Sequence, residues 1–292
     1  MLTLTRPVTN IVFDKKPTPP VKMTPAERKY FNELKLVAKE IEKILKSTLT
    51  SVTKAKGIKA MELLKRYSKT LEKWASKTVA TMFYNVNKDN QKLWNKLSAR
   101  MSRDLRKELS KPPQKTWFQK YMDDNVKLIQ SMPLEAAAKV HELVKENVYK
   151  GMRSTELVDE IMRIGGIQKN RAKTIARTET SRYSTALTEM RAESIGANWY
   201  IWKAVGDFRT RKSHKNMNNV VINWSDPPSP EKLVGEKDYG DYHPGQIFNC
   251  RCYPEVVLDI DGINFPAKVY RKGRIETMKK DQFMKMAGQV RH

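Results

Sequence analysis

The feature that most constrains the fold is a helical repeat of apolar side chains in the first half of the chain. The segment Thr24-Pro25-Ala26-Glu27 combines an N-cap threonine, a proline at the first helical position and the glutamate of a capping box. The apolar positions that follow recur every three or four residues, which is the spacing of one face of an α-helix: Phe31, Leu34, Val37, Ile41 and Leu45. We therefore predict a helix from residue 24 to about residue 52.

The same spacing continues to about residue 150 and predicts further helices over 58–87, 91–109, 117–130 and 133–149. Pro112-Pro113 and Gly151 are stop signals for two of them. Residues 24–151 are thus predicted to form a helical domain, whose apolar stripes are either the core of a bundle or a groove for a ligand. Residues 1–23 hold four prolines and no periodic apolar face, so we predict an extended arm there.

The chain is strongly basic, with 56 Lys and Arg against 32 Asp and Glu and a net charge of +24. Residues 1–150 hold 32 of the basic and 15 of the acidic side chains, a net charge of +17. Such a charge favours a polyanionic partner, because basic side chains at phosphates release counterions. We expect the basic surface of the helical domain to contact double-stranded DNA; the alternative is that its lysines only form a solvated face.

No sequence signal indicates secretion or a membrane partner. The first 20 residues lack a continuous apolar core, and no later run reaches the ~20 apolar residues that cross a bilayer. Cys250 and Cys252 are the two cysteines of the chain, and they lie too close together for a disulfide framework. We expect free thiols or thiolates in a reducing cytoplasm.

The pattern changes near residue 152. A short helix over 155–164, a Gly165-Gly166 turn and a long helix over 168–194 are predicted first. A strand is predicted at 199–205, and residues 247–253 and 255–258 are predicted to form one or two more strands. We predict a domain of residues 152–260 in which the long helix packs on a small antiparallel sheet. Residues 261–292 are predicted to be a basic tail, either an interaction tail or a short helix over 275–287. The fold class is therefore mainly α, with a small α+β domain in the C-terminal half.

Four side chains of this domain suggest a metal site. Cys250 and Cys252 are two residues apart in a predicted strand, so their side chains leave the same face. Adding His214 and His243 gives two thiolates and two imidazoles, a ligand set for tetrahedral zinc. The spacing matches no standard zinc finger, and the alternative is a pair of buried thiols with hydrogen-bonded histidines.

An enzyme is the less favoured interpretation. Asp207, His214 and a cysteine could form an acid, base and nucleophile, but such roles depend on geometry that a sequence does not supply. The sequence has neither a phosphate-binding glycine loop nor paired carboxylates at helical spacing. We therefore predict that the chain is not an enzyme and has no catalytic residues.

Four sequence blocks carry a resemblance to a known family. They are Ala176-Arg177-Thr178-Glu179-Thr180, Asp207-Phe208-Arg209-Thr210-Arg211-Lys212-Ser213-His214, His243-Pro244-Gly245 and Asn249-Cys250-Arg251-Cys252. In this order, over about residues 155–258, they resemble the C-terminal domain of the phage Mu F-like head morphogenesis proteins, which are minor capsid proteins of tailed bacteriophages. The first block leaves two interpretations open: Arg177 and Glu179 either form surface salt bridges or are buried and hold the helix against the loop of residues 207–214.

The resemblance implies a minor component of the procapsid and virion. Such a protein lies inside the phage head near the portal, aids head assembly in the bacterial cytoplasm and handles DNA during packaging or ejection. The implied partners are the portal protein, a scaffold or the major capsid protein. Two functions from other classes remain alternatives, namely a sequence-independent nucleic-acid-binding protein without a capsid role and a zinc-dependent hydrolase.

Overall fold

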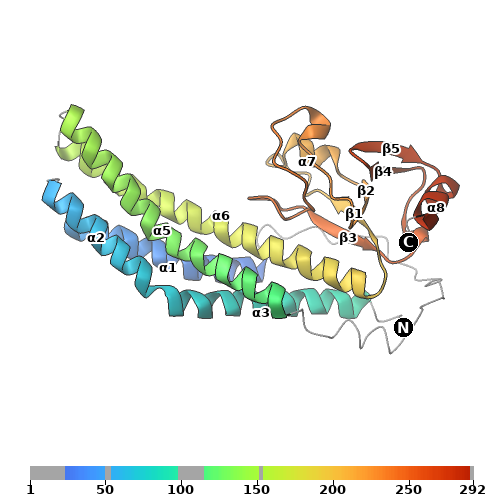
Figure 1. The fold of residues 1–292 in the computed structure, drawn as a ribbon, viewed down its shortest axis with the longest axis horizontal. Coiled ribbons are helices and arrows are strands. Elements are labelled where there is room, and N and C mark those ends of the chain that lie inside the picture. The colour runs from blue at the N-terminus through green and yellow to red at the C-terminus, as the bar shows by residue number, and fades with distance from the viewer. Residues whose placement is uncertain (1–23, 50–53, 98–114, 151–153, 290–292) are drawn as a thin grey trace. The chain divides into compact units, whose positions relative to one another are not determined.

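The computed structural model describes residues 24–49, 54–97, 115–150 and 154–289 of the chain, so the predicted arm lies outside the described residues. The described residues divide into two compact units. The helical unit lies within Met23–Asn87 and Pro113–Thr180, and the sheet unit within Lys88–Pro112 and Ser181–His292. Figure 1 labels their helices and strands.

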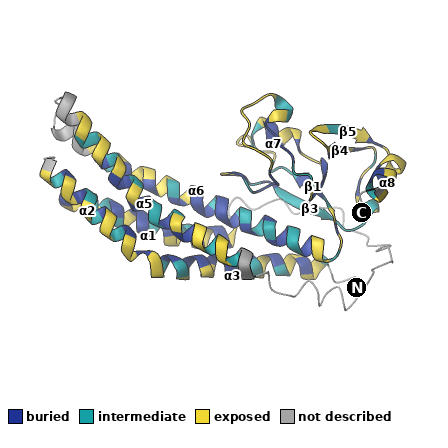
Figure 2. Cartoon of the chain, viewed as in Figure 1, coloured by how far each residue is buried: buried dark blue, intermediate teal, exposed yellow. Residues whose placement is uncertain are grey.

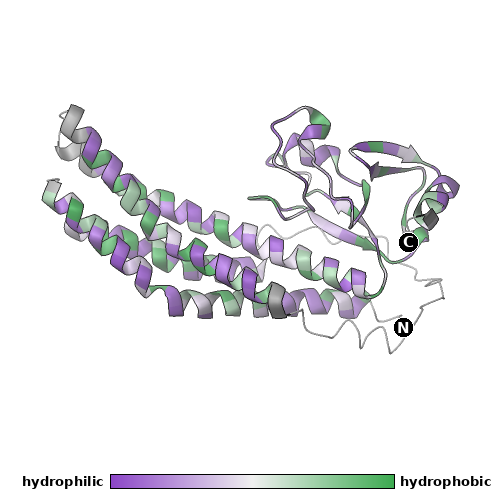
Figure 3. Cartoon of the chain, viewed as in Figure 1, coloured by the Kyte–Doolittle hydropathy of each residue, from purple (hydrophilic) through white to green (hydrophobic). Residues whose placement is uncertain are grey.

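Among the described residues up to Ser194 there are five long helices: α1 (Pro25–Thr48), α2 (Lys54–Thr70), α3 (Glu72–Leu97), α5 (Lys115–Lys150) and α6 (Ser154–Ser194). The predicted start of α1 is confirmed, since the Thr24 hydroxyl accepts the Glu27 N–H at 3.0 Å. The apolar stripe of α1 is buried, including Leu34, Ile41 and Leu45, and polar residues occupy the outer faces of the helices (Figures 2 and 3). The stripes therefore form the core of a helical bundle, in which α2 packs along α5 and both contact α1.

The predicted helix over 58–87 is wrong as a single element. It is split between α2 and α3 at Leu71, where the Leu71 N–H donates to the Ser68 carbonyl at 3.3 Å, a turn rather than a helical bond. Leu71 is buried, so packing fixes a break that no glycine or proline announces. α3 then runs on to Leu97 through residues predicted as a loop, and the rest of the predicted 91–109 helix lies outside the described residues.

Two other predicted breaks are absent. Pro133 lies inside α5, although a proline there removes one helical hydrogen bond. The helix continues through it because residues on both sides, including Ile129 and Ala137, are buried. Gly165 lies inside α6, where a β-carbon at its position would come within 3.0 Å of Glu42 Cγ on α1. This glycine therefore permits close packing of two helices and does not form the predicted turn.

The sheet unit contains five strands: β1 (Trp199–Lys203), β2 (Val221–Asn223), β3 (Tyr253–Val257), β4 (Ala267–Arg271) and β5 (Arg274–Met278). Their order is β3-β1-β2-β4-β5, and all pairs are antiparallel except β2 and β4, which pair in parallel through Val221 and Val269. The fold class, mainly α with a small α+β part, is confirmed. The predicted purely antiparallel sheet is wrong, because the chain returns to β4 by a crossover after β3.

Residues 261–289, which were predicted to belong to a basic tail, are folded. β4 and β5 complete the sheet, and α8 (Lys280–Gln289) packs on it through Phe283, whose ring lies 4.9 Å from that of Trp199. The predicted 275–287 helix begins too early, because residues 274–278 pair with β4. Apolar residues that lie between the lysines, such as Val269 and Phe283, are buried in a second core cluster of the sheet unit. The basic composition of the segment gave no sign of this core in the sequence. The predicted limits of the domains stay predictions, because compactness alone does not decide which segments fold independently.

The core of the sheet unit positions the candidate site. Tyr200 and Trp202 of β1 are fully buried and pack with Ala192, near the end of α6. Short elements complete the unit: α7 (Lys212–Asn216), η2 (Lys232–Val234) and η3 (Ile260–Gly262). Within the described ranges, no helix has the length and apolar character that a membrane crossing requires.

Candidate metal centre

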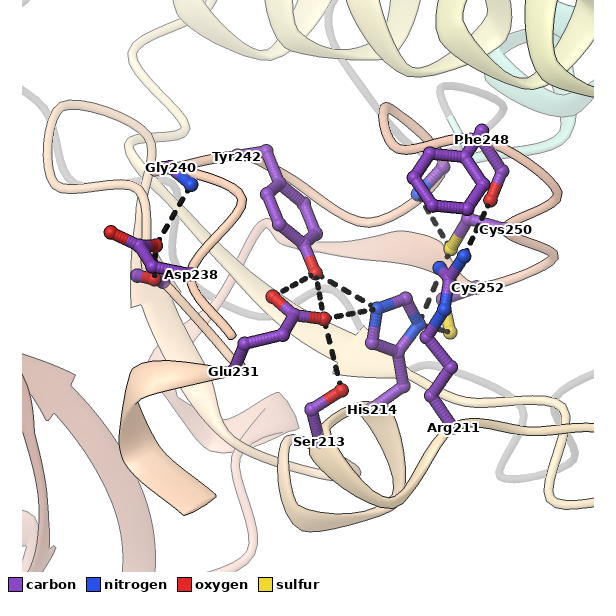
Figure 4. Close-up of polar contacts among 12 residues, drawn as sticks. Arg211, Ser213, His214, Glu231, Asp238, Gly240, Tyr242, Phe248, Cys250 and Cys252 are labelled. Atoms are coloured by element: carbon purple, nitrogen blue, oxygen red, sulfur yellow. Dashed lines mark hydrogen bonds and ion pairs between the residues drawn. The ribbon is translucent and has the colours of Figure 1, made fainter. Parts of the chain in front are cut away.

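A thiol and imidazole cluster is buried in the sheet unit (Figure 4). His214 lies on α7, and Cys250 and Cys252 lie in the segment that leads into β3. The Nδ1 atom of His214 is 3.5 Å from the Cys250 sulfur and 3.4 Å from the Cys252 sulfur. All three ligand atoms lie within 4.8 Å of one another, and all three residues are buried. Three of the four predicted metal ligands therefore converge.

These separations fit a common ion. A tetrahedral zinc with Zn–S of ~2.3 Å and Zn–N of ~2.0–2.1 Å places its sulfur and nitrogen ligands ~3.6 Å apart. The two observed sulfur–nitrogen distances, 3.5 and 3.4 Å, are close to that edge. Soft thiolates and an imidazole are also the donor types that zinc selects. The residues present thus fit a zinc ion in ligand type, distance and burial.

The far side of the His214 ring is held by a buried network (Figure 4). The Nε2 atom is 3.0 Å from the Tyr242 hydroxyl, which in turn donates to the Glu231 carboxylate at 2.7–2.8 Å. Ser213 adds a hydrogen bond to Glu231 at 3.1 Å. Because the Tyr242 proton is directed at Glu231, the hydroxyl oxygen accepts from Nε2–H, and Nδ1 presents its lone pair to the sulfurs. This tautomer is the one that a metal ligand needs.

Electrostatics reinforce these roles. Burial and the Glu231 carboxylate raise the pKa of Tyr242 far above its usual range, which keeps the hydroxyl a donor. A hydrogen bond from the Cys252 thiol, against the effect of burial and with help from His214, lowers the pKa of Cys250 well below its ordinary value. The same hydrogen bond, with burial, raises the pKa of Cys252. The cluster therefore favours one thiolate beside one thiol, and metal binding would displace the remaining proton.

His243, the fourth predicted ligand, is not part of the cluster. It is buried, with Nδ1 2.9 Å from the Tyr200 hydroxyl and Nε2 3.5 Å from a Glu189 carboxylate oxygen. Its ring also packs edge-on against Trp224. The structure thus assigns it a hydrogen-bonded place in the core. Glu231 and Tyr242, which orient His214, were missed by sequence reasoning, because contacts across 11 and 28 residues leave no spacing signal.

The loop of the His243-Pro244-Gly245 block is attached to α6. Thr185 donates to the Pro244 carbonyl at 2.7 Å, Arg182 donates to the Gln246 carbonyl, and Ser181 lies 3.4 Å from the Cys250 carbonyl. Gly245 adopts φ +89°, and a β-carbon there would meet Thr185 Oγ1 at 2.8 Å. Its N–H donates to the Cys250 sulfur at 3.3 Å. A glycine at this position therefore lets the loop, the helix and the thiolate meet.

The Asp207 block and the cysteine segment are joined by an ion pair. Arg251, between the two cysteines, donates to both oxygens of Asp207 at 2.5 Å. These bonds lower the pKa of the Asp207 carboxyl below its usual range. The alternation expected of a strand is kept in this segment, since Cys250 and Cys252 are buried while Arg251 is partly exposed. Of the one or two strands predicted within 247–258, the structure has one, and it begins only at Tyr253 and ends at Val257.

The first family block acts in the helical unit. Arg177 donates to Glu27 of α1 at 3.1 Å, and Asn125 of α5 donates to Glu179 at 3.2 Å. Glu27 and Glu179 are buried. These contacts favour buried residues over surface salt bridges, and they hold α6 to α1 and α5. The predicted contact with the 207–214 loop stays a prediction.

The comparisons with known proteins agree with this arrangement. The model of the family described as "Phage Mu protein F like protein" matches residues 138–254, which include α6 and the complete Cys/His cluster. Residues 138–254 are thus similar to the phage Mu F-like family, and the resemblance in the sequence blocks is confirmed.

One curated relative is an uncharacterized protein of Haemophilus influenzae strain Rd, 27% identical over 256 residues. The alignment covers 82% of this chain, and the chain spans about 55% of that relative's length. No solved structure matches the chain.

Proposed function

We propose that this chain is a minor head protein of a tailed bacteriophage, acting in procapsid assembly near the portal and contacting packaged DNA. The observation that carries the proposal is the match of residues 138–254 to the phage Mu F-like family, a region that includes α6 and all three residues of the Cys/His cluster. A head morphogenesis role is what this family implies. The proposed locations are the host cytoplasm during assembly and the interior of the virion afterwards.

The proposed partners within the head are the portal protein, a scaffold or the major capsid protein. Deleting the gene in its phage should lower the number of infectious particles more than the number of particles. Quantifying the chain in purified virions and in empty procapsids, and capturing it with the portal from an assembling lysate, tests the association. Wild-type infectivity after deletion, or absence of the chain from both particles, would contradict the role.

The proposed DNA contact uses the basic face of the helical unit. Lys39, Lys43 and Lys46 recur along one side of α1 and line a surface hollow of about 470 Å³. Glu42 lies among them and pairs with Lys46 at 2.6 Å, so the net charge of this face remains positive. Phosphate contacts carry no sequence information, so duplexes of unrelated sequence should bind with similar affinity.

Salt dependence tests this contact. Replacing these three lysines by glutamine in the full chain should reduce the slope of log affinity against log salt by about 2.7, at ~0.9 per lost phosphate contact. The matched control replaces three exposed lysines of the sheet unit, Lys268, Lys272 and Lys279. Equal slopes for the wild type and the α1 variant would mean that this face does not bind DNA.

We also propose that the Cys/His cluster holds one zinc ion in a structural role, with His214, Cys250 and Cys252 as its protein ligands. When bound, zinc would cross-link the α7 segment to the segment that leads into β3. The support is the convergence of three buried donors on one point with a network that fixes the imidazole. The burial of all three ligands favours this role over that of a zinc-dependent hydrolase, which needs access for a substrate and water.

A further inference from the structure

Three aromatic rings are exposed on loops of the sheet unit. Phe208 is 89% exposed, more than any other large hydrophobic side chain in the described part of the chain, and Tyr239 and Phe248 are 50% and 43% exposed. The other large aromatic side chains in the described part of this unit are buried or partly buried, and Tyr200 and Trp202 are fully buried. A phenylalanine exposed to solvent does not gain the free energy of burial. Exposed aromatic rings on one surface therefore indicate a binding site.

Each of two rings carries a guanidinium group. Arg209 lies 5.6 Å from the centre of the Phe208 ring, and Arg211 lies 4.6 Å from that of Phe248. Arg211 also donates to the Phe248 carbonyl at 2.9 Å, and Tyr239 meets Phe248 edge-on at 5.6 Å. Three loop segments therefore meet at Phe248, and we refer to Phe208, Arg209, Arg211, Tyr239 and Phe248 as the aromatic–arginine surface. Figure 4 shows Arg211 beside Phe248.

The charge of this surface is positive where the rings and arginines come together. Asp207 is the acidic residue of the 207–215 segment; Arg251 binds both of its oxygens, and the Arg209 guanidinium lies 3.6 Å from one of them. The same segment contributes four basic side chains, Arg209, Arg211, Lys212 and Lys215. On the Tyr239 side, Asp238 is paired with Lys232 at 2.9 Å. An anionic group of a ligand is therefore expected near the arginines, with its apolar part on the rings.

Part of the surface is close in sequence to the candidate metal centre. Phe248 lies two residues before Cys250, and Arg211 lies three residues before His214. The turn that presents Phe208 is closed by the Thr210 N–H, which donates to the Asp207 carbonyl at 3.0 Å. A ligand would thus meet side chains whose backbone is already fixed, which lowers the entropy cost of binding.

We propose that the aromatic–arginine surface binds an unpaired DNA strand, whose bases stack on the exposed rings while its phosphates pair with Arg209 and Arg211. Aromatic side chains combined with basic ones are how proteins bind single strands without reading sequence. In a duplex the faces of the bases are hidden, so this surface selects unpaired nucleotides. The inference goes beyond the proposed duplex contact of α1, because that contact needs only phosphates.

The test uses the full chain and two labelled probes, a thymidine 20-mer and a 20-base-pair duplex. Phe208→Ala should weaken binding of the single strand about five- to a hundredfold, the effect of losing one stacked base, and change duplex binding little. Phe208→Leu should weaken single-strand binding as much as Phe208→Ala does, since leucine is apolar but has no π face. Phe208→Tyr should bind the single strand as the wild type does. Tyr84→Ala, which removes a 65% exposed ring from α3, is the matched control and should leave single-strand binding unchanged.

A variant at a second position tests the proposal independently of Phe208. Tyr239→Ala should also weaken single-strand binding, with an unchanged thermal midpoint as evidence of folding. Single-strand affinity that is equal in the wild type, Phe208→Ala and Tyr239→Ala would overturn the proposal. So would a Phe208→Leu variant that binds as the wild type does, because an apolar protein partner would then explain the surface. Loss of duplex binding in the α1 lysine variant alone reports on the proposed function and not on this surface.

Discussion

The helical unit and the sheet unit are stabilised in different ways. The helical unit buries many equivalent apolar side chains, such as Leu34, Ile41 and Leu64, each worth ~1.5–3 kcal/mol relative to exposure. The sheet unit also has an apolar core, but its long loops are fixed by a few polar and sulfur contacts around His214 and Gly245. Stability is therefore distributed in one unit and concentrated at a few positions in the other.

This difference predicts how each unit responds to damage. A single substitution in the helical unit removes one contact among many, whereas a single substitution at the cluster frees several loop segments at once. The family blocks follow the same division, since Arg177 and Glu179 support helix packing and the blocks from Asp207 to Cys252 form the cluster and its attachments.

Removal of the proposed zinc ion is expected to have the largest effect of the changes that test this comparison. Elemental analysis of the chain purified without added zinc should find about one equivalent, and a strong chelator should unfold the sheet unit while the helical signal largely persists. Structural zinc sites contribute on the order of 10–16 kcal/mol to folding of small zinc domains. Near-ultraviolet circular dichroism of the sheet-unit tryptophans, beside far-ultraviolet helicity, separates the two units.

Matched variants identify the ligands. Cys252→Ser and His214→Ala should lose the metal, whereas His243→Ala should retain about one equivalent, because its imidazole contacts Tyr200 and Glu189. Less than about a tenth of an equivalent in the wild type, with Cys252→Ser folding normally, would refute the metal centre. Loss of metal in His243→Ala as well as in the other two variants would support the four-ligand site predicted from the sequence.

The next largest effect is expected at Gly245. In Gly245→Ala the left-handed backbone adds strain of ~1 kcal/mol or more, and the β-carbon collides with Thr185 Oγ1, for which overpacking costs of ~1–3 kcal/mol are typical. Gly240→Ala is the matched control, since Gly240 has a similar φ of +86° but no atom within 4 Å of the added carbon. The midpoint temperature of thermal unfolding of the sheet unit should therefore fall further in Gly245→Ala than in Gly240→Ala. Equal midpoints in the two variants would contradict the tight attachment of this loop to α6.

A smaller effect is expected in the helical unit from Arg177→Met. It leaves the Glu27 carboxylate buried beside an apolar group, at a cost of ~1–3 kcal/mol at neutral pH for this partly screened pair. Burial already raises the pKa of Glu27 and Arg177 opposes that rise, so the variant should raise it further. The folded state then holds a proton more tightly than the unfolded state, so the variant regains stability as the pH falls from 7 toward the ordinary value of 4.5.

The double variant Glu27→Gln with Arg177→Met supplies the control for that prediction. It removes the buried charge together with its partner, so its stability should be higher than that of Arg177→Met and independent of pH between 5 and 7. Urea unfolding followed by helicity measures all three proteins. An Arg177→Met variant as stable as the wild type would mean that the pair is not buried in solution.

The two units also differ in how much the sequence predicts. Periodicity identified the helices and the apolar stripe of α1, because each helical turn repeats the same local signal. It failed at Leu71, Pro133 and Gly165, where packing between segments far apart in sequence decides whether a helix continues. Local signals do not contain that information.

In the sheet unit, chemistry was predicted better than geometry. The rarity of cysteine identified Cys250, Cys252 and His214 as one site, which the structure brings together. The separation of His243 and the network of Glu231 and Tyr242 could not be foreseen, since both depend on loop paths without a repeat. The strands β4 and β5 were missed because lysines and arginines alternate there with buried residues such as Val269.

The smallest effect is expected at the Asp207–Arg251 pair, which is partly exposed to solvent. Hydrogen bonds from Arg251 hold the pKa of Asp207 below its ordinary value of 3.8, so the pair contributes fully above that pH and is lost as the pH falls below it. Asp207→Asn lacks the contribution at every pH. The stability difference between wild type and variant should therefore be greatest above pH 3.8 and should narrow during acidification. Asp241→Asn, on another loop, controls for the loss of one negative charge, and a difference that widens on acidification would contradict the pairing that joins the Asp207 turn to the cysteine segment.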